Sequence, residues 1–354
     1  MRTPLFLLRL RRRLGAVCLA VLLASCGGGV DSGGTGATVQ SLANGPITGF
    51  GSVIVAGIRF DDSAASVQDA DGNARSRDEL RLGMTLAVRG SAIVADADGH
   101  DAAAATSIVI GSAMVGRIAA SNLAARTLTV FKETVELTNT TVFDDSLAGG
   151  QAALAVGDVV EIHAGFDAAS GHHVATRVER KAAAAPFSLR GPVSALDALT
   201  HTLTLGATRI DTSALGAAAA LANGALLRLV VAPTPASGPV WVALRTGSGE
   251  PPIDDRGQAK LEGLVSAFVS TAQFSVDGTP VDARSASFVH GTAGLAPGAR
   301  VKVEGATRAG VLVASQVDVI SVAQQVSQEF EVRGAISTID TVAKSFVVRN
   351  VTVG

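Results

Sequence analysis

Short runs in which apolar and polar residues alternate fill most of the chain after residue 45. In TLTV at 127–130 and TLTL at 202–205 the residues two apart are apolar, so each run can bury one face as a β-strand. Gly, Asn or Asp separates the runs, and these residues favour turns. No run favours a helix longer than two turns. The pattern therefore predicts an all-β protein.

The strand pattern recurs about every 70 residues, which indicates a tandem repeat. A thirteen-residue stretch aligns without gaps from Ile118, Val193 and Ile336. In each stretch an Asn or Asp lies where its side chain can cap a turn between two strands. These capping residues are Asn122, Asp197 and Asp340, and the residues four positions later are Arg126, His201 and Lys344.

Each copy continues with further strands. A Leu, a turn Gly and an alternating strand follow about 35 residues after the start, as in LAVGDVVEIHAG from Leu154, and a last strand such as VATRVE at 174–179 closes the copy. Five or six short strands in about 70 residues predict a small antiparallel barrel, because closure removes exposed strand edges. We expect tandem barrels of the oligonucleotide/oligosaccharide-binding (OB) type or the SH3 type, with an open sandwich as the alternative.

These landmarks divide the chain into segments. The predicted segments are a signal peptide at 1–25, a lipidated Cys with a flexible Gly/Ser tether at 26–45, β repeats at 46–112, 113–181, 188–246 and 259–321, and an incomplete fifth repeat at 330–354. The fifth copy stops after its first hairpin. We expect the sequence to be a truncated form of a longer repeat protein. The alternative is that this incomplete copy pairs with the fourth copy.

The first 26 residues predict export and lipidation. Five arginines and no acidic residue precede an apolar run at 14–24, which is too short to span a bilayer and is typical of a signal peptide. Leu23-Ala24-Ser25-Cys26 then resembles the lipobox of bacterial lipoproteins, in which the Cys is acylated and becomes the first residue. An ordinary signal peptide with a chance Cys and twin-arginine export are the alternatives. By the same resemblance, Gly27 after the Cys favours the outer membrane.

Composition changes the picture in two ways. The chain carries 29 Lys+Arg against 31 Asp+Glu, a net charge of -2, and loss of five arginines with the signal peptide leaves a mature protein of about -7. An acidic mature chain with no Tyr and one Trp argues against a nucleic-acid partner. Two cysteines, Cys18 and Cys26, exclude a disulfide scaffold and a Cys-rich zinc site.

Together, the Leu23–Cys26 box, the Gly-rich spacer, GPITGFGSVIV at 45–55 and the repeats resemble a family of bacterial lipoproteins whose repeated module is a domain of unknown function. Residues 115–180 match its pattern best. The resemblance implies an all-β secreted repeat protein. It implies no activity and supplies no catalytic residues.

Candidate chemistry is sparse. The run Asp96–Asp101 and the run Asp69–Gly72 place carboxylates around a Gly, as calcium loops do, but the same place in other repeats is a plain hairpin turn, so we expect turns. We also expect His172 and His173 to lie in an exposed turn, and Trp241 to pack in a core or between repeats. No catalytic motif, metal site or cofactor is predicted, and Cys26 is the one predicted site residue, as the point of lipid attachment.

The sequence thus predicts a non-enzymatic binding, adhesion or structural module of the cell envelope, held at the membrane by its N-terminal lipid. An envelope protein or a glycan is the expected partner. The alternative is an envelope hydrolase or carbohydrate-active protein whose site lies between repeats. Carriage of a metal or ligand by the Asp-rich turns is a third hypothesis.

Overall fold

The computed structural model describes residues 40–182, 186–216, 221–235, 238–247, 253–321, 330–348 and 351–353. The predicted signal peptide, Cys26 and most of the tether lie outside these residues. Within them, none of the helices is long and apolar enough to cross a membrane.

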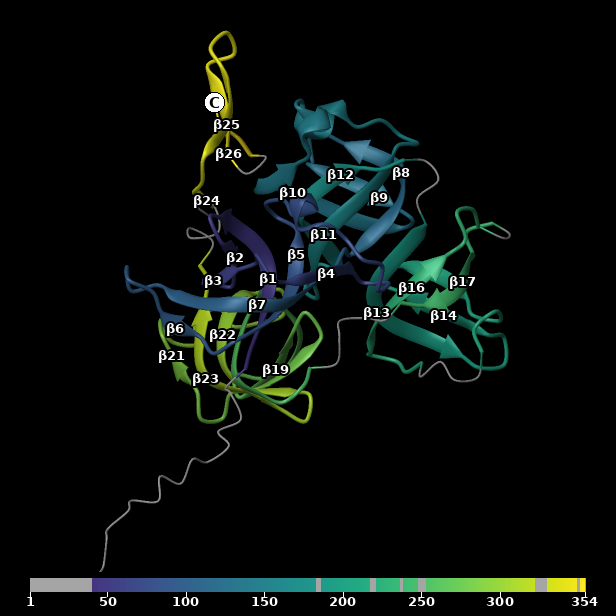
Figure 1. The fold of residues 1–354 in the computed structure, drawn as a ribbon. Helices are drawn as coiled ribbons and strands as arrows, with labels where there is room; N and C mark the ends of the chain where they lie inside the picture. Colours follow the sequence, from purple (N-terminus) through teal and green to yellow (C-terminus); the bar gives the residue numbers. More distant parts are fainter. Residues whose placement is uncertain are drawn as a thin grey trace, which may run out of the picture. The chain divides into compact units, whose positions relative to one another are not determined.

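Four five-stranded barrels follow one another along the chain (Figure 1). Barrel 1 consists of β1 (Ser41–Phe50), β2 (Val53–Val55), β3 (Ile58–Asp61), β5 (Thr85–Gly90) and β7 (Asp101–Ile110), with the short strands β4 (Ser66–Asp69) and β6 (Val94–Ala95) beside β7 and the 3-10 helix η1 (Arg77–Glu79) before β5. Barrel 2 consists of β8 (Met114–Asn122), β9 (Thr127–Val130), β10 (Glu133–Phe143), β11 (Val159–Asp167) and β12 (His172–Arg180), with the 3-10 helices η2 (Asp145–Leu147) and η3 (Gly150–Ala153) between β10 and β11.

Barrels 3 and 4 repeat this plan. Barrel 3 consists of β13 (Phe187–Asp197), β14 (Thr202–Leu205), β15 (Thr208–Asp211), β16 (Leu226–Val231) and β17 (Trp241–Thr246). Barrel 4 consists of β18 (Arg256–Ser270), β19 (Gln273–Val276), β20 (Thr279–Asp282), β22 (Arg300–Arg308) and β23 (Val311–Val319), with the short β21 (Ser287–Phe288) beside β23. The prediction of an all-β chain of small repeated barrels is confirmed.

Strand order identifies the type of barrel. In barrel 2 the ladder runs β8–β9–β10–β12–β11 and returns to β8, and the other three barrels close in the same way. This order, with two hairpins first and the last two strands exchanged, is that of an OB-like barrel. The predicted barrels are antiparallel in every ladder but one, because the third and fifth strands are parallel, as at Val135 opposite His173. A parallel pair needs a crossover, and the segment that carries η2 and η3 provides it in barrel 2.

Small aliphatic side chains fill the barrels, as the alternating runs predict. Leu128, Val130, Leu203 and Leu205 are all buried. The core of barrel 2 is continuous with that of barrel 3, whereas barrels 1 and 4 each have a core of their own.

Barrels also join through their backbones. β1 pairs in parallel with β18 from Ser41 opposite Gln258 to Asn44 opposite Leu261, which links barrel 1 to barrel 4. β8 pairs with β13 and links barrel 2 to barrel 3. Residues 41–45 are therefore strand, and their assignment to the flexible tether was wrong. Their local sequence has little apolar alternation, but two neighbouring strands, β5 and β18, satisfy their backbone groups.

The incomplete fifth repeat forms β25 (Ile336–Asp340), β26 (Ser345–Val348) and β27 (Val351–Val353), which pair antiparallel in one sheet. This is the arrangement of the first three strands of a barrel. Between barrel 4 and this sheet, β24 (Glu331–Val332) pairs with β1 of barrel 1. No described strand of the fifth repeat pairs with barrel 4.

Candidate functional site

A groove of about 430 Å³ crosses the outer face of barrel 2, and we call it the barrel 2 groove. Its floor is the polar stretch from Glu136 to Thr140 of β10. Arg126, in the turn between β8 and β9, also lines the groove. So do Leu264, Gly298 and Arg300 of barrel 4.

A bulge in β10 creates this floor. The register between β10 and β12 shifts between Leu137 and Val142, so residues 138–141 leave the ladder. Thr141 holds the bulge in place, because its hydroxyl donates to the carbonyl oxygen of Ala175 at 2.8 Å and accepts from the amide of Thr138 at 2.8 Å. The bulge presents Asn139 to solvent, where Arg126 donates a hydrogen bond to its side-chain oxygen.

Each charged side chain of the barrel 2 groove has a partner. Glu136 accepts from His172 at 2.6 Å, and Arg300 lies 3.2 Å from Glu262. Asp167 accepts hydrogen bonds at 2.8 Å from the amide of Ala169 and from the hydroxyl of Ser170, which fixes the turn between β11 and β12. Two arginines and two carboxylates line the groove, so its charges balance.

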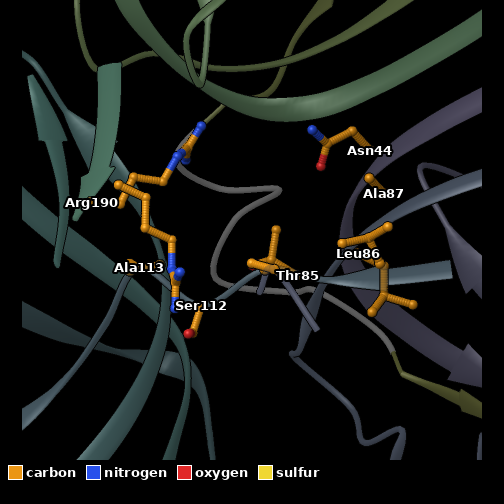
Figure 2. A pocket seen from close by; sticks show the side chains of 12 residues that line it. Asn44, Thr85, Leu86, Ala87, Ser112, Ala113 and Arg190 are labelled. Atoms are coloured by element: carbon orange, nitrogen blue, oxygen red, sulfur yellow. The ribbon is translucent and has the colours of Figure 1, made fainter. Parts of the chain in front are cut away.

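A second, smaller space lies where the barrels meet (Figure 2). It has a volume of about 30 Å³, room for one or two water molecules rather than an organic ligand. The side chains around it come from three barrels and include Asn44, Thr85, Ser112, Arg190 and Arg228. We call it the central cavity, and its lining carries structural contacts.

The most elaborate of these contacts is made by Asp71, in the Asp69–Gly72 turn of barrel 1. Its carboxylate accepts from both terminal nitrogens of Arg228, at 2.7 and 3.1 Å, and from Arg245 at 2.7 Å. Burial opposes ionisation of Asp71, but these hydrogen bonds outweigh it and lower the pKa of the carboxyl to about 2. The turn predicted from sequence is therefore also a clamp between barrels 1 and 3.

The second Asp-rich run, Asp96–Asp101, is a hairpin turn as predicted. The carboxylate of Asp96 accepts from the amides of Asp98 and His100, each at 2.9 Å. Asp101 lies 2.6 Å from Lys260 of barrel 4. In the described part of the chain, no cluster of three His, Cys, Asp or Glu side chains suits a metal ion.

A buried cluster of charged groups joins barrel 2 to barrel 1. Lys181 lies 2.7 Å from Glu161; burial works against the charge of Lys181, but the carboxylate outweighs it and raises the pKa of the ammonium. His163 is fully buried, and burial lowers the pKa of its imidazole, so the ring is neutral at neutral pH. Arg177 donates to the carbonyl oxygen of Leu82 in barrel 1 at 3.1 Å.

Glu133 and His173 form a second buried pair, with side chains 1% and 2% exposed. Nε2 of His173 lies 3.7 Å from Oε2 of Glu133. One carboxylate oxygen of Glu133 accepts from the amide of Ala207 at 2.9 Å and the hydroxyl of Thr208 at 2.6 Å, both in barrel 3. The other carboxylate oxygen and both ring nitrogens of His173 make no hydrogen bond with any described residue.

The other barrels have no acid or imidazole at these two places. The strand registers place Ile58, Thr208 and Thr279 where barrel 2 has Glu133. Ala103, Trp241 and Leu312 stand where it has His173. The pair is therefore a feature of barrel 2 and not of the repeat.

The structure corrects one expectation and confirms another. His172 and His173 begin β12 and point to opposite faces, so the prediction of an exposed turn was wrong for His173. The backbone continues as a strand there because His173 pairs with Val135 and Phe166. Trp241 packs against Phe131 of barrel 2 at 4.7 Å between ring centroids, which confirms the predicted packing between repeats.

Comparison with known families finds a match in two segments of the chain. Residues 115–179 and 262–318 match the family described as Domain of unknown function (DUF5666). The two segments coincide with barrel 2 and with most of barrel 4, so the family module corresponds to one five-stranded barrel. No curated protein matches the chain.

Proposed function

We propose that this chain is a lipid-anchored, non-enzymatic binding module of the bacterial cell envelope, and that the barrel 2 groove is its binding site. One observation carries the proposal. The groove lies on the third strand of an OB-like barrel, between the turn of the first hairpin and the turn that joins the fourth and fifth strands. OB-like barrels bind their ligands on this face and at these two turns.

The chemistry of the groove supports binding. Its floor offers hydroxyl and amide groups from Thr138, Asn139 and Thr140, and its charged groups are already held by neighbours. Groups that are fixed in this way lose little conformational freedom when a ligand arrives. The strand pairing between barrels 1 and 4, and between barrels 2 and 3, makes the two barrels that carry the groove more rigid.

The anchor rests on sequence. The lipobox at Leu23–Cys26 supports attachment of lipid to Cys26, and several acyl chains together hold a protein stably at a membrane. We propose the outer membrane as its location, because Gly27 follows Cys26.

Binding can be tested on the mature chain with an array of envelope glycans and peptides, with generic ester and peptide substrates in parallel. We expect saturable binding without turnover. Arg126→Ala should weaken it about tenfold, because one charged hydrogen-bond donor is lost. His201→Ala removes the equivalent turn residue of barrel 3 and should change nothing. Turnover of any substrate would support the hydrolase alternative. Equal effects of the two variants on binding would exclude the barrel 2 groove as the binding site.

Anchoring needs its own test. Cys26→Ser should abolish labelling by a fatty acid and move the protein to the soluble fraction. Cys18→Ser is the matched control, because this Cys lies within the predicted signal peptide. Unchanged membrane fractionation of the Cys26→Ser protein would overturn the lipoprotein assignment.

A further inference from the structure

The barrel 2 groove continues into a second hollow. This hollow, of about 950 Å³, is lined by residues of barrel 4 that include His290, Ala293 and Val319. Three residues line both spaces, namely Asp167, Gly298 and Arg300. The two spaces therefore adjoin at these three residues, and we call them together the long groove, with the Asn139 end in the first space and the Ala293 end in the second. The two volumes together exceed the roughly 300–1,000 Å³ of a usual small-molecule site, which suits a polymer better.

Barrels 2 and 4 meet closely beneath it. Gly165 of β11 has no side chain where Leu264 of β18 packs, and a Cβ atom there would lie 3.0 Å from the Leu264 side chain. Val319 and Pro297 add apolar surface beyond this contact. The long groove thus combines hydroxyl and amide groups at one end with small apolar surfaces at the other.

Its electrostatics argue against a charged polymer. Arg126 and Arg300 are balanced by Glu136 and Asp167, and His290 lies 2.7 Å from Asp318. A site for nucleic acid or an anionic glycan needs an excess of positive charge. The long groove offers none along its described lining.

Its strands argue against a peptide. Extended peptides commonly bind by adding a strand to an open sheet edge. In barrel 2, β10 pairs with β9 and β12, and β12 pairs with β10 and β11, so the floor has no open edge.

We propose that the long groove binds a linear, uncharged oligosaccharide. Hydroxyl and amide side chains hydrogen-bond sugar hydroxyls at the Asn139 end, and the small apolar surfaces lie against sugar rings at the Ala293 end. The proposal rests on the proposed function, of which it names the ligand class.

The test measures the dependence of affinity on chain length. Mature protein is titrated with linear neutral oligosaccharides of two to eight glucose or N-acetylglucosamine units, with an oligouronate and an uncharged peptide of similar length in parallel. We expect affinity for one neutral series to rise at least tenfold between two and six units, because only longer chains reach both ends of the groove. The oligouronate and the peptide should bind at least tenfold more weakly.

Two variants locate the ligand. Asn139→Ala should weaken short and long chains alike, by three- to tenfold. Ala293→Trp blocks the far end and should remove the gain with length while leaving the shortest ligand unaffected. Ala214→Trp, at an exposed position on barrel 3, is the matched control and should have no effect. Circular dichroism of each variant checks that it is folded.

The outcomes separate the two proposals. Tighter binding of the peptide or the oligouronate would overturn the ligand class and leave a binding module. If neutral glycans bind with the same affinity to the Asn139→Ala and Ala293→Trp variants as to the natural chain, the long groove is not the binding site. Absence of binding to any probe would overturn this inference and weigh against the proposed function as well.

Discussion

Replacement of His173 by Leu tests whether the buried Glu133–His173 pair acts as a unit. Barrel 4 has Leu312 at the equivalent position, so a Leu fits the repeat. The substitution leaves a carboxylate that is 1% exposed facing an apolar side chain. A buried polar group that loses its polar neighbour costs about 1–3 kcal/mol, so we expect a loss of roughly that size in the free energy of unfolding.

The single Trp makes the measurement direct. Trp241 lies in barrel 3 and packs against Phe131 of barrel 2, so its fluorescence during urea unfolding reports on the joint core of these barrels. His172→Leu is the control, because His172 and its partner Glu136 are 36% and 41% exposed and such surface pairs contribute about 0–1 kcal/mol.

A second substitution separates charge from shape. Glu133→Gln keeps the oxygen that accepts from Ala207 and Thr208 but removes the charge. Added to His173→Leu, it should recover at least about 1 kcal/mol of the loss. The reasoning is refuted if His173→Leu is as stable as the natural chain, or if the double variant is no more stable than His173→Leu alone.

Three further predictions concern contacts between barrels. Asp71→Ala should lower the free energy of unfolding in urea by about 2–4 kcal/mol, since it leaves the buried Arg228 without its carboxylate. Arg245→Ala, which removes a side chain that is 49% exposed, should lower it by less than about 1 kcal/mol, and equal losses would contradict the clamp. Because the pKa of Asp71 is about 2 instead of the ordinary 3.8, its ionisation stabilises the fold above pH 4, and about 1 kcal/mol of that stability, after solvent screening, should be lost as the pH falls towards 2. Asp71→Asn should remove this part of the pH dependence of the free energy of unfolding, and an unchanged pH dependence would contradict the prediction. Gly206→Ala should lower the free energy of unfolding by about 2–3 kcal/mol, because the backbone φ is +61° and the new Cβ atom would lie 2.3 Å from the Glu133 carboxylate. Gly224→Ala, which also has a positive φ but open space around it, should lower it by about 1 kcal/mol, and similar losses would show that backbone strain alone matters.

Local patterns predicted much of the fold. The residues expected to cap turns do so, since Asn122 accepts from the amide of Ala125 at 3.0 Å and Asp197 from that of Leu199 at 2.8 Å. Arg126 and His201, which align in the repeats, both have a positive φ, at 55° and 51°. These features depend on a few neighbouring residues, which is why the sequence contains them.

Non-local pairing was not predictable in the same way. The parallel third and fifth strands, and the strand at 41–45, depend on partners far along the chain. Glu133 was missed because ETVEL reads as an alternating surface strand, whereas barrel 3 covers that face of barrel 2. A signal was present, since the aligned repeats have Thr at this position in barrels 3 and 4.

The parallel ladder between β1 and β18 has a consequence for how the number of repeats can change. In most tandem repeats each unit contacts only its neighbours, so loss or gain of a unit shortens or lengthens the array. Here the first barrel is hydrogen-bonded to the fourth, from Ser41 opposite Gln258, across the whole length of the second and third. Deletion of an internal unit would separate partners that now meet, and so would duplication. The four barrels are therefore expected to be inherited together as one unit.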